Sequence, residues 1–339
     1  MISYLQKYYY LILNLTPVNK LVLHSIMQVH KDISNLPFFK NAVITIGTFD
    51  GVHTGHLQII EQLKEEARMI SGETVIITFD PHPRLVVPTA DHNIRLLNTL
   101  EEKIELLANK QIDHLVVVPF TELFSQQTAE EYIDKFIFQF FHPHTIIIGF
   151  DHHFGKDRRG NYLLLEEFSR QYHFQVKQIP EHVLNEITIS STKIRNALLG
   201  NDIATANKFL GYDNFFEGVV VEGDKIGRTI GYPTANLVLG DQSKLVPGDG
   251  IYAVEIAIED ASIRFNGMMS IGLRPTIGKS NRTIEIHVLD FKSDLYDKII
   301  RVFVKSFIRS ELKFKDLEEL KRAIANDEII ARRLLTKIN

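Results

Sequence analysis

Hydrophobic residues recur along the first half of the chain in short continuous runs, separated by stretches with helical spacing. The apolar runs cover residues 43–46, 74–79, 114–120 and 145–150. Apolar side chains three and four positions apart, as on one face of a helix, occur in residues 57–69, 99–108 and 129–140. Strands that are apolar on both faces are typical of a parallel sheet covered by helices. The pattern therefore predicts an α/β domain with ligands outside the carboxyl ends of its strands.

The pattern changes after Tyr212, where short β-rich segments recur between glycine, proline and aspartate residues. These segments cover residues 216–221, 251–258, 263–271, 283–291 and 299–307. Several short strands at close spacing predict a small antiparallel β-barrel. Helical periodicity returns over residues 316–337, which predicts a helix packed on that barrel.

These patterns predict two domains joined by a helical connector. The first domain, the connector and the barrel domain are expected at residues 27–188, 189–211 and 212–339. Ser190 or Ser191 is the expected N-cap of the first connector helix, and Gly200 is its expected stop. Residues 1–26 differ from the rest and are expected to be a leader, either a disordered tail or a start-site artefact. A weak signal peptide is the alternative.

The composition narrows the class of protein. The 339 residues carry a net charge of −4, from 38 basic and 42 acidic side chains, without a long block of one sign. This balance argues against a nucleic-acid partner or a membrane surface, while small anionic ligands fit it. The chain has no cysteine, which excludes disulfides and thiolate metal sites and suits the cytoplasm. We expect a soluble cytoplasmic enzyme, and the sequence does not indicate its oligomeric state.

The segment from Gly47 to His56 follows the first apolar run and holds Gly47, Gly51, His53 and His56. Glycines let the backbone approach a ligand, and the first turn of a helix offers unpaired N–H groups to phosphate. The two histidines are three residues apart and add donors that could stabilise pyrophosphate leaving ATP. The alternative is a structural histidine pair at a helix start. The H-x-G-H spacing resembles the signature of the nucleotidyltransferase superfamily.

A second glycine-rich segment extends from Gly223 to Asn236. It is not a Walker loop, because only three residues separate Gly223 from Gly227 and no Gly-Lys-Ser/Thr follows. With Lys225 and Arg228 it could still hold phosphates, and Thr234 and Asn236 supply oxygen ligands suited to Mg²⁺. A simple hairpin turn is the alternative.

Residues 283–288 alternate in a way that predicts a strand with two distinct faces. Ile284, Ile286 and Val288 would share one face, and Glu285 and His287 the other. A carboxylate there could take the proton from a substrate hydroxyl that attacks a γ-phosphate. The alternative is a glutamate that faces solvent.

Taken together, these motifs resemble the bifunctional bacterial riboflavin kinase/FAD synthetase family over about residues 27 to 338. The motifs of the resemblance are residues 47–56, 78–83, 189–195, 231–237, 271–276 and 285–291. The resemblance implies a Rossmann-like nucleotidyltransferase domain with a parallel sheet and a riboflavin kinase barrel with a C-terminal helix. It implies ATP-dependent phosphorylation of riboflavin to FMN, followed by adenylylation of FMN to FAD, with Mg²⁺ as cofactor and ATP as co-substrate.

The resemblance also implies roles for individual residues. In the adenylyltransferase, ATP would contact Gly47, Phe49, Asp50, Gly51, His53, His56, Ser191, Thr192 and Arg195, with His53 and His56 catalytic. FMN would contact Pro81, His82 and Asp151. In the kinase, ATP would contact Gly223, Gly227, Arg228, Thr234 and Asn236, and the last two would also bind the metal. Glu285 would be the general base, and Arg309 would lie near the flavin.

Two departures from the family pattern are visible. His152-His153 replaces the usual Phe-Arg pair of G-x-D-F-R-F-G, so the contacts expected there with FMN are in doubt. Neighbouring side chains on a strand point apart, which favours stacking or solvent roles over a metal site. Ser270 replaces a common Asn, which we expect to be tolerated. Two other functions remain open at this stage: one working module only, or a flavin or nucleotide sensor without turnover.

Overall fold

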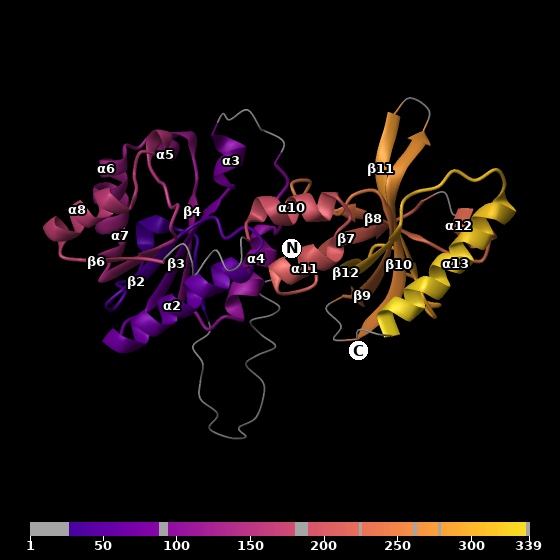
Figure 1. Ribbon diagram of the computed structural model, residues 1–339, viewed down its shortest axis with the longest axis horizontal. Helices are drawn as coiled ribbons and strands as arrows, with labels where there is room; N and C mark the ends of the chain where they lie inside the picture. The colour runs from indigo at the N-terminus through magenta and orange to yellow at the C-terminus, as the bar shows by residue number, and fades with distance from the viewer. Residues whose placement is uncertain are drawn as a thin grey trace, which may run out of the picture.

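The computed structural model describes residues 27–87, 94–179, 189–223, 226–259, 263–276 and 279–336. The expected leader, residues 1–26, lies outside this part of the chain. Figure 1 shows two modules, with a sheet-and-helix module on the left, a barrel on the right, and helices α10 and α11 between them. Among the helices described, none combines the length and apolar character that a bilayer crossing requires.

The first module is built on a six-stranded sheet in the order β1-β4-β3-β2-β5-β6, and every strand pair is parallel. Its strands are β1 Gln28–His30, β2 Val43–Ile46, β3 Thr74–Asp80, β4 His114–Pro119, β5 Thr145–Ile148 and β6 Gln175–Gln178. Its longer helices are α2 Thr54–Ile70, α4 Leu100–Ala108 and α8 Tyr162–Tyr172. Shorter helical segments are η1 Ile33–Asn35, α3 Pro83–Val86, α5 Glu122–Ser125, α6 Ala129–Glu131, α7 Gln139–Phe141 and η3 Lys156–Arg158.

Both faces of this sheet are covered by apolar side chains. Val43 and Ile44 are fully buried neighbours that belong to different hydrophobic clusters, one packed against α2 and one against α8. This arrangement explains why the central strands are apolar without alternation. The helix expected over residues 129–140 contains a π-helical segment, η2 Tyr132–Phe138, in which the N–H of Gln139 reaches the carbonyl of Asp134. Within this segment the Tyr132 and Phe136 rings lie 5.0 Å apart and belong to an aromatic cluster.

The second module is a closed barrel in the order β10-β11-β8-β7-β12-β9, with antiparallel pairing throughout. Its strands are β7 Phe215–Val221, β8 Ala235–Leu239, β9 Gly250–Ile258, β10 Arg264–Thr276, β11 Lys279–Val288 and β12 Ile299–Arg309. The short helix α12 Ile226–Thr229 lies between β7 and β8, and α13 Leu317–Thr336 lies across the outside of the barrel (Figure 1). The predicted fold class, a parallel α/β domain followed by an antiparallel barrel and a helix, is confirmed.

The connector consists of α10 Ser191–Leu199 and α11 Ile203–Leu210. Ser190 is the N-cap of α10, since its side chain accepts a hydrogen bond from the Lys193 N–H, and Gly200 is the C-cap. The buried side chains of both helices, such as Ile194 and Leu210, belong to the same hydrophobic cluster as the barrel interior. The connector therefore packs as part of the barrel core.

Backbone pairing and buried charges join the two modules directly. The Leu96 N–H donates to the carbonyl of Ser243 at 2.7 Å, and the Leu245 N–H donates to the carbonyl of Leu96 at 2.7 Å. Lys244 from the barrel donates to Glu102 of α4 at 2.5 Å and to the Leu97 carbonyl at 2.7 Å, and both of its partners are buried with it. Because α4 and residues 94–98 belong to the first module, the barrel helps to hold that module's loops.

Candidate active sites

The loop after β2 has a backbone that few residues can adopt. Gly51 has φ of +91°, and a Cβ there would lie 2.7 Å from a Leu97 methyl group. Phe49 and Val52 also have positive φ, which is costly for a bulky and a β-branched side chain. Such strain is typical of functional loops whose surroundings enforce it. The loop ends at α2, whose N-cap is His53.

The two histidines of this loop form one stacked unit. Their ring centroids are 3.7 Å apart, and the ring planes differ by 13°. A Cβ at Gly55 would lie 3.2 Å from the His53 ring, so the absence of a side chain at this position leaves room for the ring. His53 Nδ1 accepts the His56 N–H at 3.4 Å, which puts the imidazole proton of His53 on Nε2, the other ring nitrogen.

Burial keeps both imidazoles neutral near pH 7. Burial lowers the pKa of His53 to about 4. Burial also lowers the pKa of His56 well below its ordinary value, and the nearby His53 and Lys103 lower it further. The buried Nδ1 of His56 makes no hydrogen bond within the described part of the chain. The pair can therefore offer N–H groups to an anion, but it carries no positive charge of its own.

Residues of the connector lie against this loop, although the sequence separates them widely. Ser191 Oγ donates to the Asp50 carbonyl at 2.9 Å across 141 positions. Arg195 forms an ion pair with the Asp50 carboxylate and donates to the Arg95 carbonyl at 2.7 Å. Thr192 lies in the first turn of α10. The structure thus brings the two expected phosphate-binding motifs to one place.

Asp50 contacts protein groups in this structure. Its side chain is buried, and besides Arg195 it accepts the N–H groups of Leu97 at 2.9 Å and Asn98 at 3.3 Å. Tyr212 strengthens the same corner by donating to the Gly51 carbonyl at 2.6 Å. Asp50 therefore fixes residues 97–98 against the loop, and its direct contact with ATP stays a prediction.

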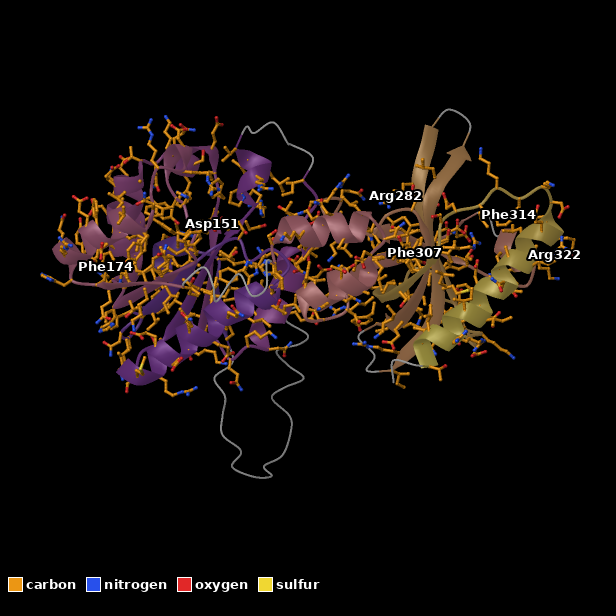
Figure 2. All side chains as sticks on the ribbon, viewed as in Figure 1. Asp151, Phe174, Arg282, Phe307, Phe314 and Arg322 are labelled. Carbon is orange, nitrogen blue, oxygen red and sulfur yellow. The ribbon has the colours of Figure 1, made fainter. Side chains whose placement is uncertain are left out.

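The residues expected at FMN occupy different settings. His82 is buried at the N-cap of α3, and burial, Lys103 and Arg195 lower its pKa to about 3. Asp151 is exposed in the turn after β5 and is labelled in the left-hand module of Figure 2. Pro81 lies between β3 and α3. FMN contacts of these residues stay predictions.

The two side chains of the unusual His152-His153 pair lie in different environments. The His152 ring lies 5.9 Å from the Phe154 ring, and burial lowers its pKa to about 4. His153 Nδ1 lies 3.1 Å from the Arg158 carbonyl on the exposed side of the loop. The two side chains thus have separate contacts, one with an aromatic ring and one with the basic loop.

Lys103 is a buried residue beside the candidate site that the sequence analysis missed. It is 6% exposed, and its Nζ donates to Thr78 Oγ1 at 3.3 Å at the end of β3. A signal was present, since Lys103 lies one helical turn before the buried Leu107 and so interrupts the apolar face of α4. A lysine on such a face is rarely buried without an anion to meet.

The second site lies outside the barrel, beneath α13. A cavity of about 360 Å³ opens there, of a size typical for small-ligand pockets. Strands β10 and β11, helix α13 and the segment before it form its walls. Lining residues include Thr234, Met268, Ser270, Gly272, Thr283, Glu285, His287, Arg309, Phe314, Ile324 and Asp327.

The predicted kinase residues gather at one end of this cavity. Thr234 Oγ1 donates to Glu285 Oε2 at 3.2 Å, and Glu285 is paired in register with Asn236 on the adjacent strand. A Cβ at Gly223 would lie 1.9 Å from the Asn236 amide, so this glycine lets the loop cross close over Asn236. Ile284, Ile286 and Val288 are buried, as their alternation predicts. Glu285 faces the cavity, which argues against the alternative of a purely solvent-facing glutamate.

Other members of the glycine-rich segment are placed less closely. Gly227 lines the cavity, and a Cβ there would meet the Tyr232 carbonyl at 2.2 Å. Arg228 is exposed in α12, and Lys225 lies outside the described residues. Since β7 and β8 pair as antiparallel neighbours, the segment does join a hairpin, and that connection also borders the cavity.

The oxygen donors at this end fit a magnesium ion bound mainly by phosphate and water. Thr234, Asn236 and Glu285 present a hydroxyl, an amide and a carboxylate, the hard ligands that Mg²⁺ prefers. Within the described residues no group of three or more His, Asp or Glu side chains could hold a metal by itself. An ion here would need phosphate oxygens to complete its coordination.

Arg309 lines the far wall of the cavity. It forms a double hydrogen bond with Asp327 of α13, at 2.9 and 2.7 Å, and its guanidinium lies 5.8 Å from the Phe314 ring. Figure 2 shows Phe314 beside α13. Arg309 therefore ties β12 to α13, and a direct contact with flavin stays a prediction.

Comparisons with known proteins cover almost the whole chain. A family model for FAD synthetase matches residues 37–193, and one for riboflavin kinase matches residues 210–335. The bifunctional riboflavin kinase/FMN adenylyltransferase of Escherichia coli K12 is 36% identical over 293 residues, which are 86% of this chain and 92% of that protein. The protein of the same description from Listeria monocytogenes is 34% identical over 299 residues, 88% of this chain and 94% of its own.

A solved structure extends the likeness to three dimensions. The crystal structure of a protein described as a macrolide-efflux protein from Streptococcus pneumoniae gives a TM-score of 0.79 at 29% identity, covering 91% of this chain and 99% of that one. Sequence and fold thus agree across both modules. The chain belongs to the family of bifunctional riboflavin kinase/FMN adenylyltransferases.

Proposed function

We propose that the two sites act in succession on one flavin. The barrel module, residues 212–339, phosphorylates riboflavin to FMN, and the sheet module, residues 27–188, uses a second ATP to convert FMN to FAD. The connector, residues 189–211, completes the second site. The observation that carries this proposal is that the Thr234–Glu285 pair and the stacked His53–His56 pair lie in different modules of one chain.

In the kinase, Glu285 accepts the proton of the riboflavin 5′ hydroxyl as that oxygen attacks the γ-phosphate of ATP and ADP leaves. Thr234 holds the carboxylate in place through its 3.2 Å hydrogen bond. Thr234 and Asn236 are the residues that would hold Mg²⁺, which when bound neutralises charge on the phosphates. The cavity under α13 takes the flavin ring and excludes water from it.

In the adenylyltransferase, a phosphate oxygen of FMN attacks the α-phosphate of ATP, and the bond to pyrophosphate breaks. The N–H groups of His53 and His56 and the start of α2 stabilise the charge on the leaving pyrophosphate. Ser191, Thr192 and Arg195 hold the nucleotide from the connector side. No covalent enzyme intermediate is needed, because positioned donors suffice for a direct transfer.

A single incubation tests both steps. Purified protein is supplied with riboflavin, ATP and Mg²⁺, and the flavins are separated over time, with a parallel reaction that starts from FMN. We expect FMN to appear first and FAD to follow, with release of pyrophosphate. If riboflavin is converted to FMN and neither reaction forms FAD, only the kinase is active. Tight flavin binding with neither product would indicate a sensor.

A further inference from the structure

Lys103 has a position that the steps above do not use. Its ammonium contacts the hydroxyl of Thr78, and that hydroxyl in turn donates to the Thr48 carbonyl at 3.1 Å. Thr48 belongs to the loop after β2, and Thr78 lies near the end of β3. The ammonium is therefore located at the carboxyl edge of two central strands, where ligands of parallel sheets bind.

Comparison with the buried Lys244 and the partly buried Lys305 shows what Lys103 lacks. Lys244 donates to Glu102 at 2.5 Å, and Lys305 donates to Asp213 at 2.7 Å. Within the described residues, Lys103 has no carboxylate oxygen within 4.0 Å, and its Nζ makes one hydrogen bond of 3.3 Å to a neutral hydroxyl. Removing an ammonium from water without a close anion is unfavourable. The structure thus leaves a buried cation with donors to spare.

The charges around Lys103 point to an incoming anion. Asp50 and Asp80 act on it from farther away and support its ammonium form, while burial lowers its pKa. Asp50 is already paired with Arg195. Because the neighbouring imidazoles of His56 and His82 are neutral near pH 7, they do not supply the charge that a polyphosphate needs.

The electrostatic neighbours of Lys103 also locate that anion. Lys103 lowers the pKa of His56, which belongs to the proposed triphosphate site, and of His82, which is expected to contact FMN. The contacts of Lys103 agree with this, because Thr78 of β3 also bonds the Thr48 carbonyl in the loop before His53, and β3 leads directly to His82. Between these two segments we expect the α-phosphate, where the new bond forms and the old one breaks.

We propose that Lys103 is a further catalytic residue of adenylyl transfer. Its ammonium donates to a non-bridging oxygen of the ATP α-phosphate while the FMN phosphate oxygen bonds to that phosphorus and pyrophosphate departs. Lys103 keeps its proton throughout and neutralises the charge that concentrates on the phosphorus. This inference rests on the proposed adenylyltransferase function.

The first test compares Lys103→Met with Lys64→Met, which removes a lysine that pairs with Glu61 on α2. We expect Lys103→Met to lower kcat for FAD formation from FMN about 10²- to 10³-fold, with smaller changes in KM for ATP and FMN. Lys64→Met should stay within about threefold of wild type in the same assay. FMN formation from riboflavin, measured on the same samples, should not change for either variant.

A chemical rescue separates charge from packing. The chain has no cysteine, so Lys103→Cys introduces a unique thiol, and 2-bromoethylamine converts it to a lysine analogue. Because the position is buried, alkylation is done in urea and followed by refolding, with wild type treated in parallel and circular dichroism as the check. We expect the aminoethyl adduct to regain at least about tenfold in FAD formation over an iodoacetamide adduct, which carries no charge.

The outcomes are distinct. If wild type makes no FAD from FMN and ATP, the proposed function itself fails. If wild type does so and folded Lys103→Met keeps kcat within threefold, or if both adducts recover equally, Lys103 is a packing residue and the inference is wrong. Should Lys103→Met not fold, the two adducts of Lys103→Cys decide the question by the same comparison.

Discussion

The candidate adenylyltransferase site draws its residues from segments far apart in the sequence, whereas the polar end of the candidate kinase site, with Thr234, Asn236 and Glu285, lies on and beside two neighbouring barrel strands. Ser191 reaches the Asp50 carbonyl across 141 positions, while Glu285 and Asn236 are register partners on adjacent strands. The first site contains the buried Lys103, the partly buried Arg195 and neutral imidazoles, and the second presents oxygen donors. We therefore expect substitutions at the interface between the modules to lower the activity of the first site more than that of the second.

The largest effect is expected from Glu285→Gln, which removes the proposed base and keeps the shape of the side chain. FMN formation should fall about 10²- to 10⁴-fold, and FAD formation from supplied FMN should stay near wild type. The measurement is the initial rate of each step on one preparation. Equal loss of both activities would contradict separate sites.

Lys244→Met tests whether the barrel supports the other module's loops. Removing one partner of a buried ion pair leaves Glu102 uncompensated and destabilises by about 3–5 kcal/mol. We expect a lower free energy of unfolding and a larger loss of FAD formation than of FMN formation. Lys298→Met, which breaks an exposed pair with Glu259, is the matched control and should cost under about 1 kcal/mol. Equal losses of FAD and FMN formation would contradict the expected difference between the two sites.

His56→Ala is the counterpart of the glutamate variant at the other site. We expect FAD formation to drop about 10²- to 10³-fold, since one positioned N–H donor is lost, while FMN formation is unaffected. Release of pyrophosphate from ATP and FMN gives the rate. An unchanged rate would restore the interpretation of the pair as structural.

The pH dependence of stability sharpens the contrast further. His53 has a folded pKa of about 4 against an ordinary value of 6.5, so the unfolded chain binds its proton first as the pH falls. Its contribution is complete above pH 6.5 and is lost as the pH falls toward 4, by about 3 kcal/mol at most. Denaturant unfolding of wild type and His53→Gln across this range should show the difference. Parallel curves would exclude a role for His53.

The fold and the motifs were largely readable from the sequence, because buried strands such as Thr74–Asp80 are mostly apolar without alternation and the motifs follow strand ends. Strands β1 Gln28–His30 and β6 Gln175–Gln178 were missed because edge strands are short and polar. The extra length of β10 and β11 was missed because their outer ends lose the apolar alternation. These elements are stabilised by pairing with neighbours, which local sequence does not reveal.

The candidate sites show the same limit. Strand alternation predicted the face on which Glu285 lies, but only the family resemblance implied its role as general base. Lys103 was overlooked because a single lysine in an amphipathic helix looks like a solvated charge until its depth is known. Lys244 was overlooked because its partner, Glu102, comes from the other module. The role of such residues depends on partners far away in the sequence, and the local sequence pattern does not identify these partners.

The packing of α10 and α11 into the barrel core bears on how the enzyme can be divided. A kinase fragment that starts at Tyr212 would lose Ile194, Leu198, Ile203 and Leu210 from the cluster that they share with the strands. Hydrophobic surface that these side chains cover would then be exposed to solvent, which promotes aggregation of the fragment. A dissection of the two halves should therefore cut ahead of Ser190, so that both helices stay with the kinase.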